Sequence, residues 1–180
     1  MFMDCGKALM ELKGTALEEA CDRLGRFELY HLLFKPTMTD KLHTAEQFAF
    51  APKDYLKWTQ LCAGGSLQIC ELFGVRGEDR ETGLKYGRYD AGQREAEKAG
   101  LPAGYHVFAE ANFGDYYCFR EPSDGTRDDC VYQWGLHEGE VVLVWDSFSD
   151  WLAEQVNMWV EMIADDELDP IGYKMEDHHE

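Results

Sequence analysis

The sequence predicts a single α+β domain in which helices pack on one side of a mainly antiparallel sheet. Three observations support this prediction. A proline-started helix, a Gly64-Gly65 break and an apolar strand follow one another from Pro52 to Gly74. Short aromatic-rich runs separated by turn sequences then occupy residues 105–145, and an amphipathic helix follows them. With 180 residues, 45% of them hydrophobic, the chain can bury one full core.

Local physics explains the segment from Pro52 to Gly74. Pro52 suits the first turn of a helix, because its missing N–H would have no partner there. Gly64 and Gly65 can end the helix by adopting positive φ, and the apolar residues after them predict a buried strand. The expected core positions are Tyr55, Trp58, Thr59 and Cys62 on one helical face, then Leu67, Ile69, Cys70, Leu72 and Phe73 in the strand.

The chain before this segment predicts helix with one ambiguity. Apolar residues recur at helical spacing from Leu9 to Leu24, whereas residues 27–34 fit either a strand or a further helical turn. We expect residues 1–43 to form an N-terminal helical extension or part of the domain, and residues 44–164 to form the domain itself.

Residues 76–88 are polar and rich in glycine, which predicts a solvated loop. Asp90, with Gln93 three residues later, predicts a capping box at the start of a short exposed helix. Gly100 and Pro102 are expected to end that helix.

Four strands are expected next, in two hairpins. Residues 105–111 and 116–119 are separated by the turn sequence of residues 112–115, and residues 131–134 and 141–145 by a stretch that contains Gly135 and Gly139. The polar, acidic residues 122–129 form the turn between the two pairs.

The last helix has the clearest signature. Ser147 can cap its start, and Asp150 stands three residues later as the reciprocal partner. Its apolar face is predicted to cover one face of the sheet. That face consists of Phe148, Trp151, Leu152, Gln155, Val156, Trp159 and Ile163.

Negative charge is concentrated in the second part of the chain. Residues 101–180 hold 19 acidic and 3 basic side chains, whereas the first hundred hold 16 and 14. Such a field repels nucleic acid and anionic membranes and attracts a basic partner. The acidic residues 165–180 are expected to form a weakly ordered tail.

The six cysteines form no C-x-x-C pair, and the N-terminus lacks the basic and long apolar regions of a secretory signal. Reduced thiols and a cytoplasmic location are therefore expected.

Five pieces of the chain, in order, resemble the SUKH superfamily, or Smi/Knr-type domain. They are AEQFAFAPKDYLKWTQLCAGG, LQICELFG, VFAEANFGDYYCF, VYQWG and WDSFSDWLAEQV, and they cover about residues 44–157. Where the family usually has Asn-Gly before its first strand, this chain has Gly64-Gly65 preceded by Cys62-Ala63. Gly65, Gly114 and Asp115 are expected to form turns that maintain the fold.

The resemblance implies a binding module without enzymatic activity. Bacterial members are widely immunity proteins that neutralise toxin domains, often nucleases, while fungal members act as regulatory scaffolds. A basic nuclease surface would suit an acidic inhibitor. The candidate partner contacts are Asp124, Asp128 and Asp129 in one turn, Glu138 and Glu140 in the next, and Tyr132 and Trp134 as exposed aromatic anchors. The alternatives are a regulatory scaffold of the same fold and a small hydrolase.

A hydrolase would need a catalytic site, and the sequence contains no recognised motif for one. Adjacent strands could assemble Cys118 and His106 into a catalytic pair, but aromatic residues surround Cys118, which favours a buried thiol. Phosphate-loop and G-x-S-x-G motifs are missing from the sequence. Only His178 and His179 are adjacent, in the acidic tail, and we expect no metal or other cofactor.

Overall fold

The computed structural model describes residues 18–19, 22, 48–66, 70–73, 77–78, 85–86, 89–111 and 114–164. The expected tail at residues 165–180, the ambiguous residues 27–34 and nearly all of the expected helix from Leu9 to Leu24 lie outside these ranges.

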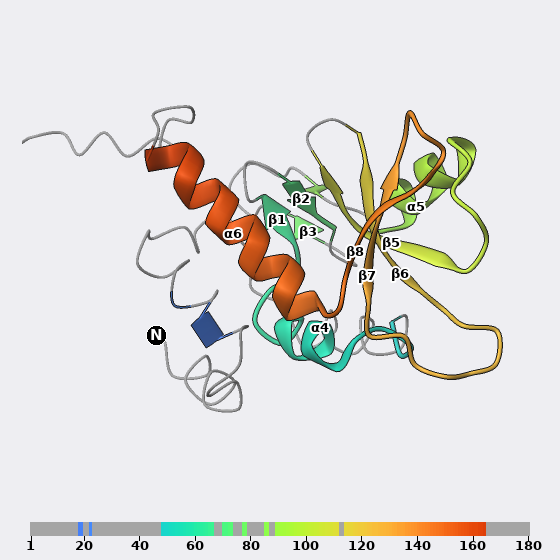
Figure 1. The fold of residues 1–180 in the computed structure, drawn as a ribbon, viewed down its shortest axis with the longest axis horizontal. Helices are drawn as coiled ribbons and strands as arrows, with labels where there is room; N and C mark the ends of the chain where they lie inside the picture. Colours follow the sequence, from blue (N-terminus) through green and yellow to red (C-terminus); the bar gives the residue numbers. More distant parts are fainter. Residues whose placement is uncertain are drawn as a thin grey trace, which may run out of the picture.

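The domain is built on a six-stranded, fully antiparallel sheet in the order β1-β2-β5-β6-β7-β8 (Figure 1). Its strands are β1 (Gly65–Ser66), β2 (Cys70–Leu72), β5 (Tyr105–Ala111), β6 (Tyr116–Arg120), β7 (Val131–Gly135) and β8 (Glu140–Trp145). The helices are α4 (Lys53–Trp58), α5 (Tyr89–Lys98) and α6 (Phe148–Ala164). The expected α+β class and antiparallel sheet are confirmed.

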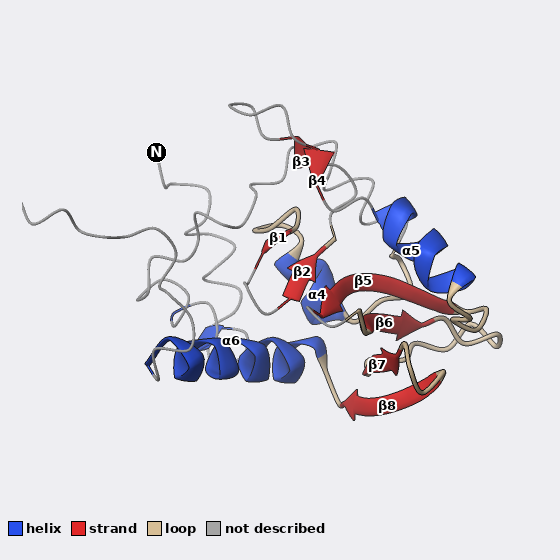
Figure 2. Ribbon diagram, turned by 90° about the horizontal axis from the view of Figure 1, so that it is seen from above, coloured by secondary structure: helices blue, strands red, loops and turns tan. Residues whose placement is uncertain are grey.

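Helices cover both faces of this sheet. Along β6, Tyr117 and Phe119 pack in one core with α4 and α6, while Tyr116 and Cys118 pack in a second core with Ala96 of α5. Because successive strand residues point to opposite faces, the two cores lie on opposite sides of the sheet. Figure 2 shows α6 and α5 on either side of the strands. The expected packing of helices on one side therefore describes α4 and α6, and α5 adds a second layer.

Aromatic rings fill the larger core. Phe108 and Phe119 stack with centroids 4.3 Å apart, and Trp151 of α6 meets Phe108 edge-on at 4.9 Å. The expected apolar faces of α4 and α6 are confirmed, since their described members are buried. Those members are Tyr55, Trp58, Thr59 and Cys62 on the α4 side, and Phe148, Trp151, Leu152, Gln155, Val156 and Trp159 on α6. Leu67 and Ile69, and the side chain of Ile163, fall outside the described part of the structure.

Ser147 caps the start of α6 as expected, and the Asp150 side chain bonds to the hydroxyl of this cap residue. The Ser147 hydroxyl donates to Asp150 at 2.6 Å and accepts from the Asp150 backbone N–H at 3.0 Å. Asp54 of α4 also accepts hydrogen bonds from the backbone N–H and the hydroxyl of Ser149, at 2.7 and 2.6 Å. These bonds fix the start of α6 against α4.

Three local expectations were wrong. α4 ends at Trp58, with Thr59 as its C-cap, so Gly64 and Gly65 do not end the helix. Residues 76–88 include a small antiparallel ribbon of β3 (Gly77–Glu78) and β4 (Lys85–Tyr86) rather than loop alone. Asp90 lies inside α5 and does not cap it, because the helix begins at Tyr89. Gln93 instead ties α5 to β5, donating to the Tyr105 carbonyl at 3.0 Å and accepting from the Val107 N–H at 2.8 Å.

Candidate protein-binding surface

The predicted contact residues lie at two opposite ends of the sheet. In an antiparallel sheet, successive connections alternate between the ends of the strands. Asp124 and Asp129, in the β6–β7 connection, are therefore at one end, and Glu138, in the β7–β8 turn, is at the other. All three side chains are exposed, as is Glu140 at the start of β8. The two acidic turns do not meet in a single patch.

Asp128 was expected to be a partner contact in an acidic turn, but it is buried, so this prediction was wrong. Its side chain is 8% exposed and binds Arg120 at 2.6 and 2.8 Å. It also accepts hydrogen bonds from the Tyr132 hydroxyl at 2.8 Å and the Cys130 N–H at 3.1 Å. Burial opposes its ionisation, but these hydrogen bonds and the guanidinium outweigh burial and lower the pKa of Asp128. The residue stabilises the start of β7.

Tyr132 and Trp134 are not the exposed aromatic anchors that the sequence suggested. Tyr132 is 9% exposed and Trp134 is 1% exposed. Both point toward the α5 side of the sheet, where Trp134 stacks near Tyr116 with centroids 6.4 Å apart. Strand alternation places these rings in the second core, which the sequence pattern did not reveal.

Asp115 and Gly114 have the turn role expected of them. Asp115 accepts hydrogen bonds from the Gln133 amide at 2.8 Å and the Leu136 N–H at 3.0 Å, so it connects the β5–β6 turn to β7. Gly114 has φ of 89°, a conformation that favours glycine. Gly65 differs, because it lies in β1 opposite Leu72, with φ of 136°.

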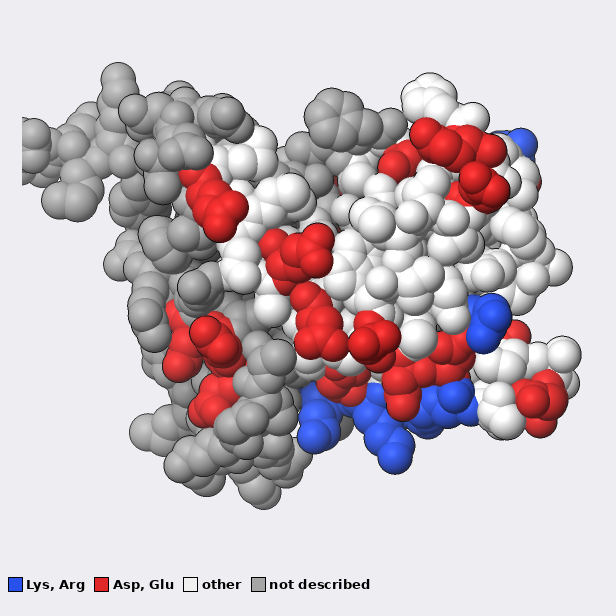
Figure 3. All heavy atoms as spheres, in the orientation of Figure 1, with Lys and Arg blue, Asp and Glu red and all other residues white. Residues whose placement is uncertain are grey.

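An exposed aliphatic stretch on β8 joins the two acidic ends. Val142, Leu143 and Val144 are 38%, 52% and 53% exposed. They follow Glu138 and Glu140, and they precede Asp146, which is also exposed. In Figure 3 the surface over β8 is largely uncharged, with acidic side chains around it. We call residues 138–146 the β8 edge.

The β8 edge was missed because its sequence resembles a buried strand. Residues 141–144 read Val-Val-Leu-Val, without the polar alternation of a half-exposed strand. Only the strand order shows that β8 ends the sheet. The signal available in the sequence was an apolar run flanked by acidic turns in the last strand before the final helix, where an edge strand can lie.

Basic side chains are missing from this region of the sequence. Residues 128–164 contain eight acidic side chains and no lysine or arginine. Apart from the buried Asp128, the acidic members are all exposed. They are Asp129, Glu138, Glu140, Asp146, Asp150, Glu154 and Glu161. Basic side chains gather instead along the edge by α4 (Figure 3). The charged side chains that β8, α6 and their flanking turns contribute are therefore all acidic.

The suggested Cys118–His106 pair is wrong. Cys118 lies opposite Val107 on the α5 side of the sheet, and its thiol contacts the Tyr132 carbonyl oxygen at 3.4 Å. Burial raises its pKa to about 12, so the thiol stays protonated. His106 faces the other side, where its ring lies 4.3 Å from that of Phe50 and its Nε2 is 3.0 Å from Glu121. The favoured interpretation of Cys118 as a buried thiol is confirmed.

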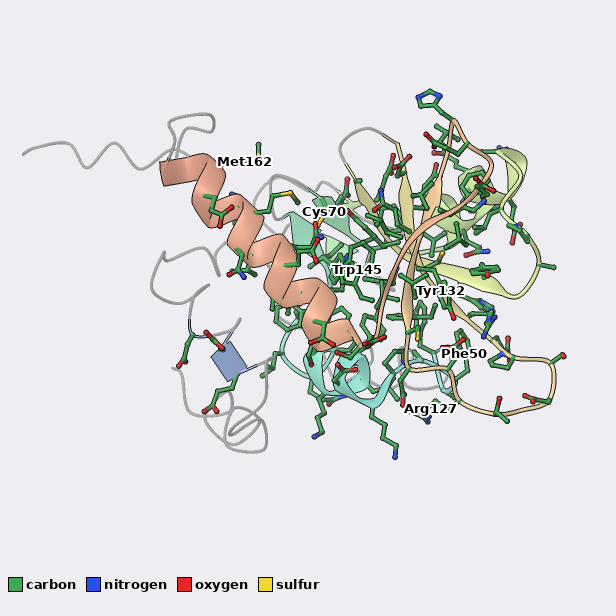
Figure 4. The ribbon with its side chains drawn as sticks, in the orientation of Figure 1. Phe50, Cys70, Arg127, Tyr132, Trp145 and Met162 are labelled. Carbon is green, nitrogen blue, oxygen red and sulfur yellow. The ribbon has the colours of Figure 1, made fainter. Side chains whose placement is uncertain are left out.

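An open hollow of about 450 Å³ lies beside His106, with Phe50 and Arg127 on its lining (Figure 4). The Arg127 guanidinium donates to the carbonyl oxygens of Ala51 and Ala49, at 2.9 and 3.1 Å. These groups hold residues 48–51 against the β6–β7 connection. Within the described residues, no group of three or more His, Cys, Asp or Glu side chains could hold a metal ion.

A comparison with protein-family models identifies the domain. The model of the SMI1 / KNR4 family (SUKH-1) matches residues 48–154, which is more than half of the chain. The chain belongs to the SUKH-1 family. No curated protein and no solved structure was found to match it.

The family match covers most of the described helices and strands. It begins at Phe48, before α4, and runs to Glu154 in α6, so α4, the first part of α6 and all six strands of the main sheet lie within the matched range. The β8 edge lies within the matched range. Among the described helices, none has the length and apolar character that crossing a bilayer requires.

Proposed function

We propose that this SUKH-1 domain is a cytoplasmic immunity protein that binds and neutralises a basic toxin domain, such as a nuclease domain, through the acidic surface of β8 and α6. The observation that carries the proposal is the single sign of the charged side chains that these elements contribute, with six exposed carboxylates from Glu138 to Glu161 and no lysine or arginine between residues 128 and 164. Domains that bind phosphate backbones carry basic surfaces, which this arrangement complements.

Two buried thiols of the sheet support a role in binding. The thiols of Cys70 and Cys118 are buried, and burial raises the pKa of each. A protonated, enclosed thiol is a poor nucleophile. The exposed carboxylates instead create a long-range field that accelerates encounter with a basic protein.

Co-expression tests the biological role. The chain is expressed with a toxin domain encoded beside it, and we expect growth to be rescued. Failure of every neighbouring toxin to be neutralised would contradict the immunity role and favour the regulatory scaffold.

Association kinetics test the electrostatic role with the same toxin domain. The triple variant Glu138→Gln, Glu140→Gln and Asp146→Asn should associate several-fold more slowly, with a flatter dependence on salt. Glu95→Gln is the matched control, because Glu95 is exposed on α5, on the other side of the sheet. Equal effects of the triple variant and the control would refute the role of the β8 surface.

A further inference from the structure

The β8 edge has the features of a strand that can accept another strand. Within the part of the chain that the structure describes, β8 is the last strand of its sheet and is paired with β7 alone. A strand at the edge of a sheet carries backbone N–H and C=O groups that can pair with a further strand. Its residues 142–144 are exposed aliphatic side chains.

Edge strands are protected by an inward-pointing charge, a proline or a lysine along the strand, or by a β-bulge. A charge, a proline and a lysine are the devices that block pairing along the whole strand, whereas a bulge disturbs it locally. No charge, proline or lysine occurs between Val141 and Trp145. A register shift opposite Gln133 and Trp134 leaves Val142 without a Cα partner, while Leu143 and Val144 lie opposite Gln133 and Tyr132. β8 therefore has a bulge at Val142, and its regular pairing with β7 runs from Leu143 to Trp145, just before the acidic residue Asp146.

The two faces of β8 offer different contacts. Leu143 lies on the same face as Trp145, whose indole N–H donates to Glu154 of α6 at 2.7 Å. Val144 lies on the opposite face, which it shares with Tyr132. An added strand would therefore place alternate side chains against Leu143 on one face and Val144 on the other.

Charge decides between the candidate occupants. Two copies of this chain paired through β8 in antiparallel fashion would bring Glu138 and Glu140 of one copy toward Asp146 of the other. Like charges in such positions disfavour association. A strand with aliphatic residues between lysines or arginines would match both the apolar centre and the acidic ends of the β8 edge.

We propose that β8 receives an extended basic and aliphatic segment of a partner protein as a seventh strand of the sheet. The inference rests on the proposed function, since it assumes that the domain binds a basic protein. It adds the surface, the mode of binding and the chemistry of the bound segment. Backbone hydrogen bonds would supply the pairing, and the flanking charges would set the register of the segment.

The test uses the full chain and a synthetic peptide of alternating valine and threonine with two lysines at each end. Calorimetry should show saturable binding, and NMR should show shifted backbone amides in residues 140–146. The double variant Leu143→Ser and Val144→Ser keeps the charge unchanged and should weaken binding about tenfold or more. Met158→Ser is the matched control, because Met158 is 40% exposed on α6 and should leave binding unchanged.

Peptide methylation separates strand addition from attraction of charge alone. N-methyl groups on alternate residues block one edge of the peptide, and two peptides methylated in complementary positions present opposite edges. One of them should lose binding and the other should keep it. Equal binding of both peptides, or the same affinity for the double serine variant and wild type, would overturn the inference.

The toxin domain from the co-expression experiment distinguishes this inference from the proposed function. If neutralising the acidic side chains weakens toxin binding while the double serine variant binds normally, the seventh strand is refuted and the immunity function stands. If no toxin is neutralised but the peptide adds to β8, the function fails and the docking surface stands. A dimer of the chain alone that the double serine variant abolishes would identify a second copy as the occupant and overturn the proposal.

Discussion

Replacing Asp128 with Asn tests whether this carboxylate is structural. Its Oδ2 accepts from Arg120 and from the Tyr132 hydroxyl at 2.8 Å, and its Oδ1 accepts from the Cys130 N–H at 3.1 Å. Asn preserves the shape of the side chain but removes its charge. It also replaces one carboxylate oxygen, which accepts hydrogen bonds, with an NH₂ group, which can only donate them. Removing one partner of a buried ion pair costs about 3–5 kcal/mol. Because the Arg120 side chain is 48% exposed and can return to water, we expect a loss of about 2–3 kcal/mol.

Urea unfolding measures this loss, with Asp129→Asn as the control. Asp129 carries the same charge on the next residue but is exposed, so its replacement should change the free energy of unfolding by less than about 0.5 kcal/mol. Equal effects of the two substitutions would refute the structural role of Asp128.

The pH dependence gives a second check on the same residue. The pKa of Asp128 is lower in the folded protein than its ordinary value, because the hydrogen bonds and Arg120 outweigh the opposing effect of burial. Its contribution to stability is therefore fully present above the unfolded pKa of about 3.9 and is lost as the pH falls through the folded pKa. The stability gap between wild type and Asp128→Asn should stay constant from neutral pH to about 5 and close at lower pH. A gap that widened on acidification would contradict this reasoning.

Three further substitutions are expected to change stability in defined ways. Trp151→Ala should cost about 3–5 kcal/mol in urea unfolding, because the ring is fully buried, and a loss no larger than that of Met158→Ala would contradict its core role. Ser147→Ala should cost about 1 kcal/mol by removing the α6 cap, and unchanged helix stability would argue against that cap. Glu110→Gln should stabilise the domain at neutral pH, since burial and the neighbouring carboxylate of Glu71 raise the pKa of Glu110. Its gain should disappear as acid protonates Glu110 in the wild type, and a gain independent of pH would refute the electrostatic cause.

The sequence predicted the elements that depend on interactions between residues close together in the chain. The cap at Ser147 and the 3.6-residue period of α6 are contained within a few turns of sequence, and both are confirmed. The four strands between residues 105 and 145 also lie where aromatic runs and turns place them.

Features that depend on distant partners were not predictable in the same way. Asp128 lies in an acidic turn, but its partner Arg120 comes from the preceding strand, and pairing across the turn buries it. The Gln93 side chain fits a capping box in sequence, whereas β5 offers it backbone groups in space. The exposure of Leu143 follows from strand order, which a single apolar run does not encode.

The bonds from Ser149 to Asp54 have a consequence for synthesis of the chain. The two residues are 95 positions apart, and the α4 ring of Tyr55 packs at 5.1 Å from Phe148. A ribosome makes α4 long before α6, so the contacts between α4 and α6 cannot form until nearly the whole described domain has been translated, although Phe108 and Phe119 can pack on Tyr55 earlier. Contacts of such long sequence separation slow folding and leave the nascent chain open to aggregation. A chaperone that shields newly made apolar segments would be most useful to this protein during that interval.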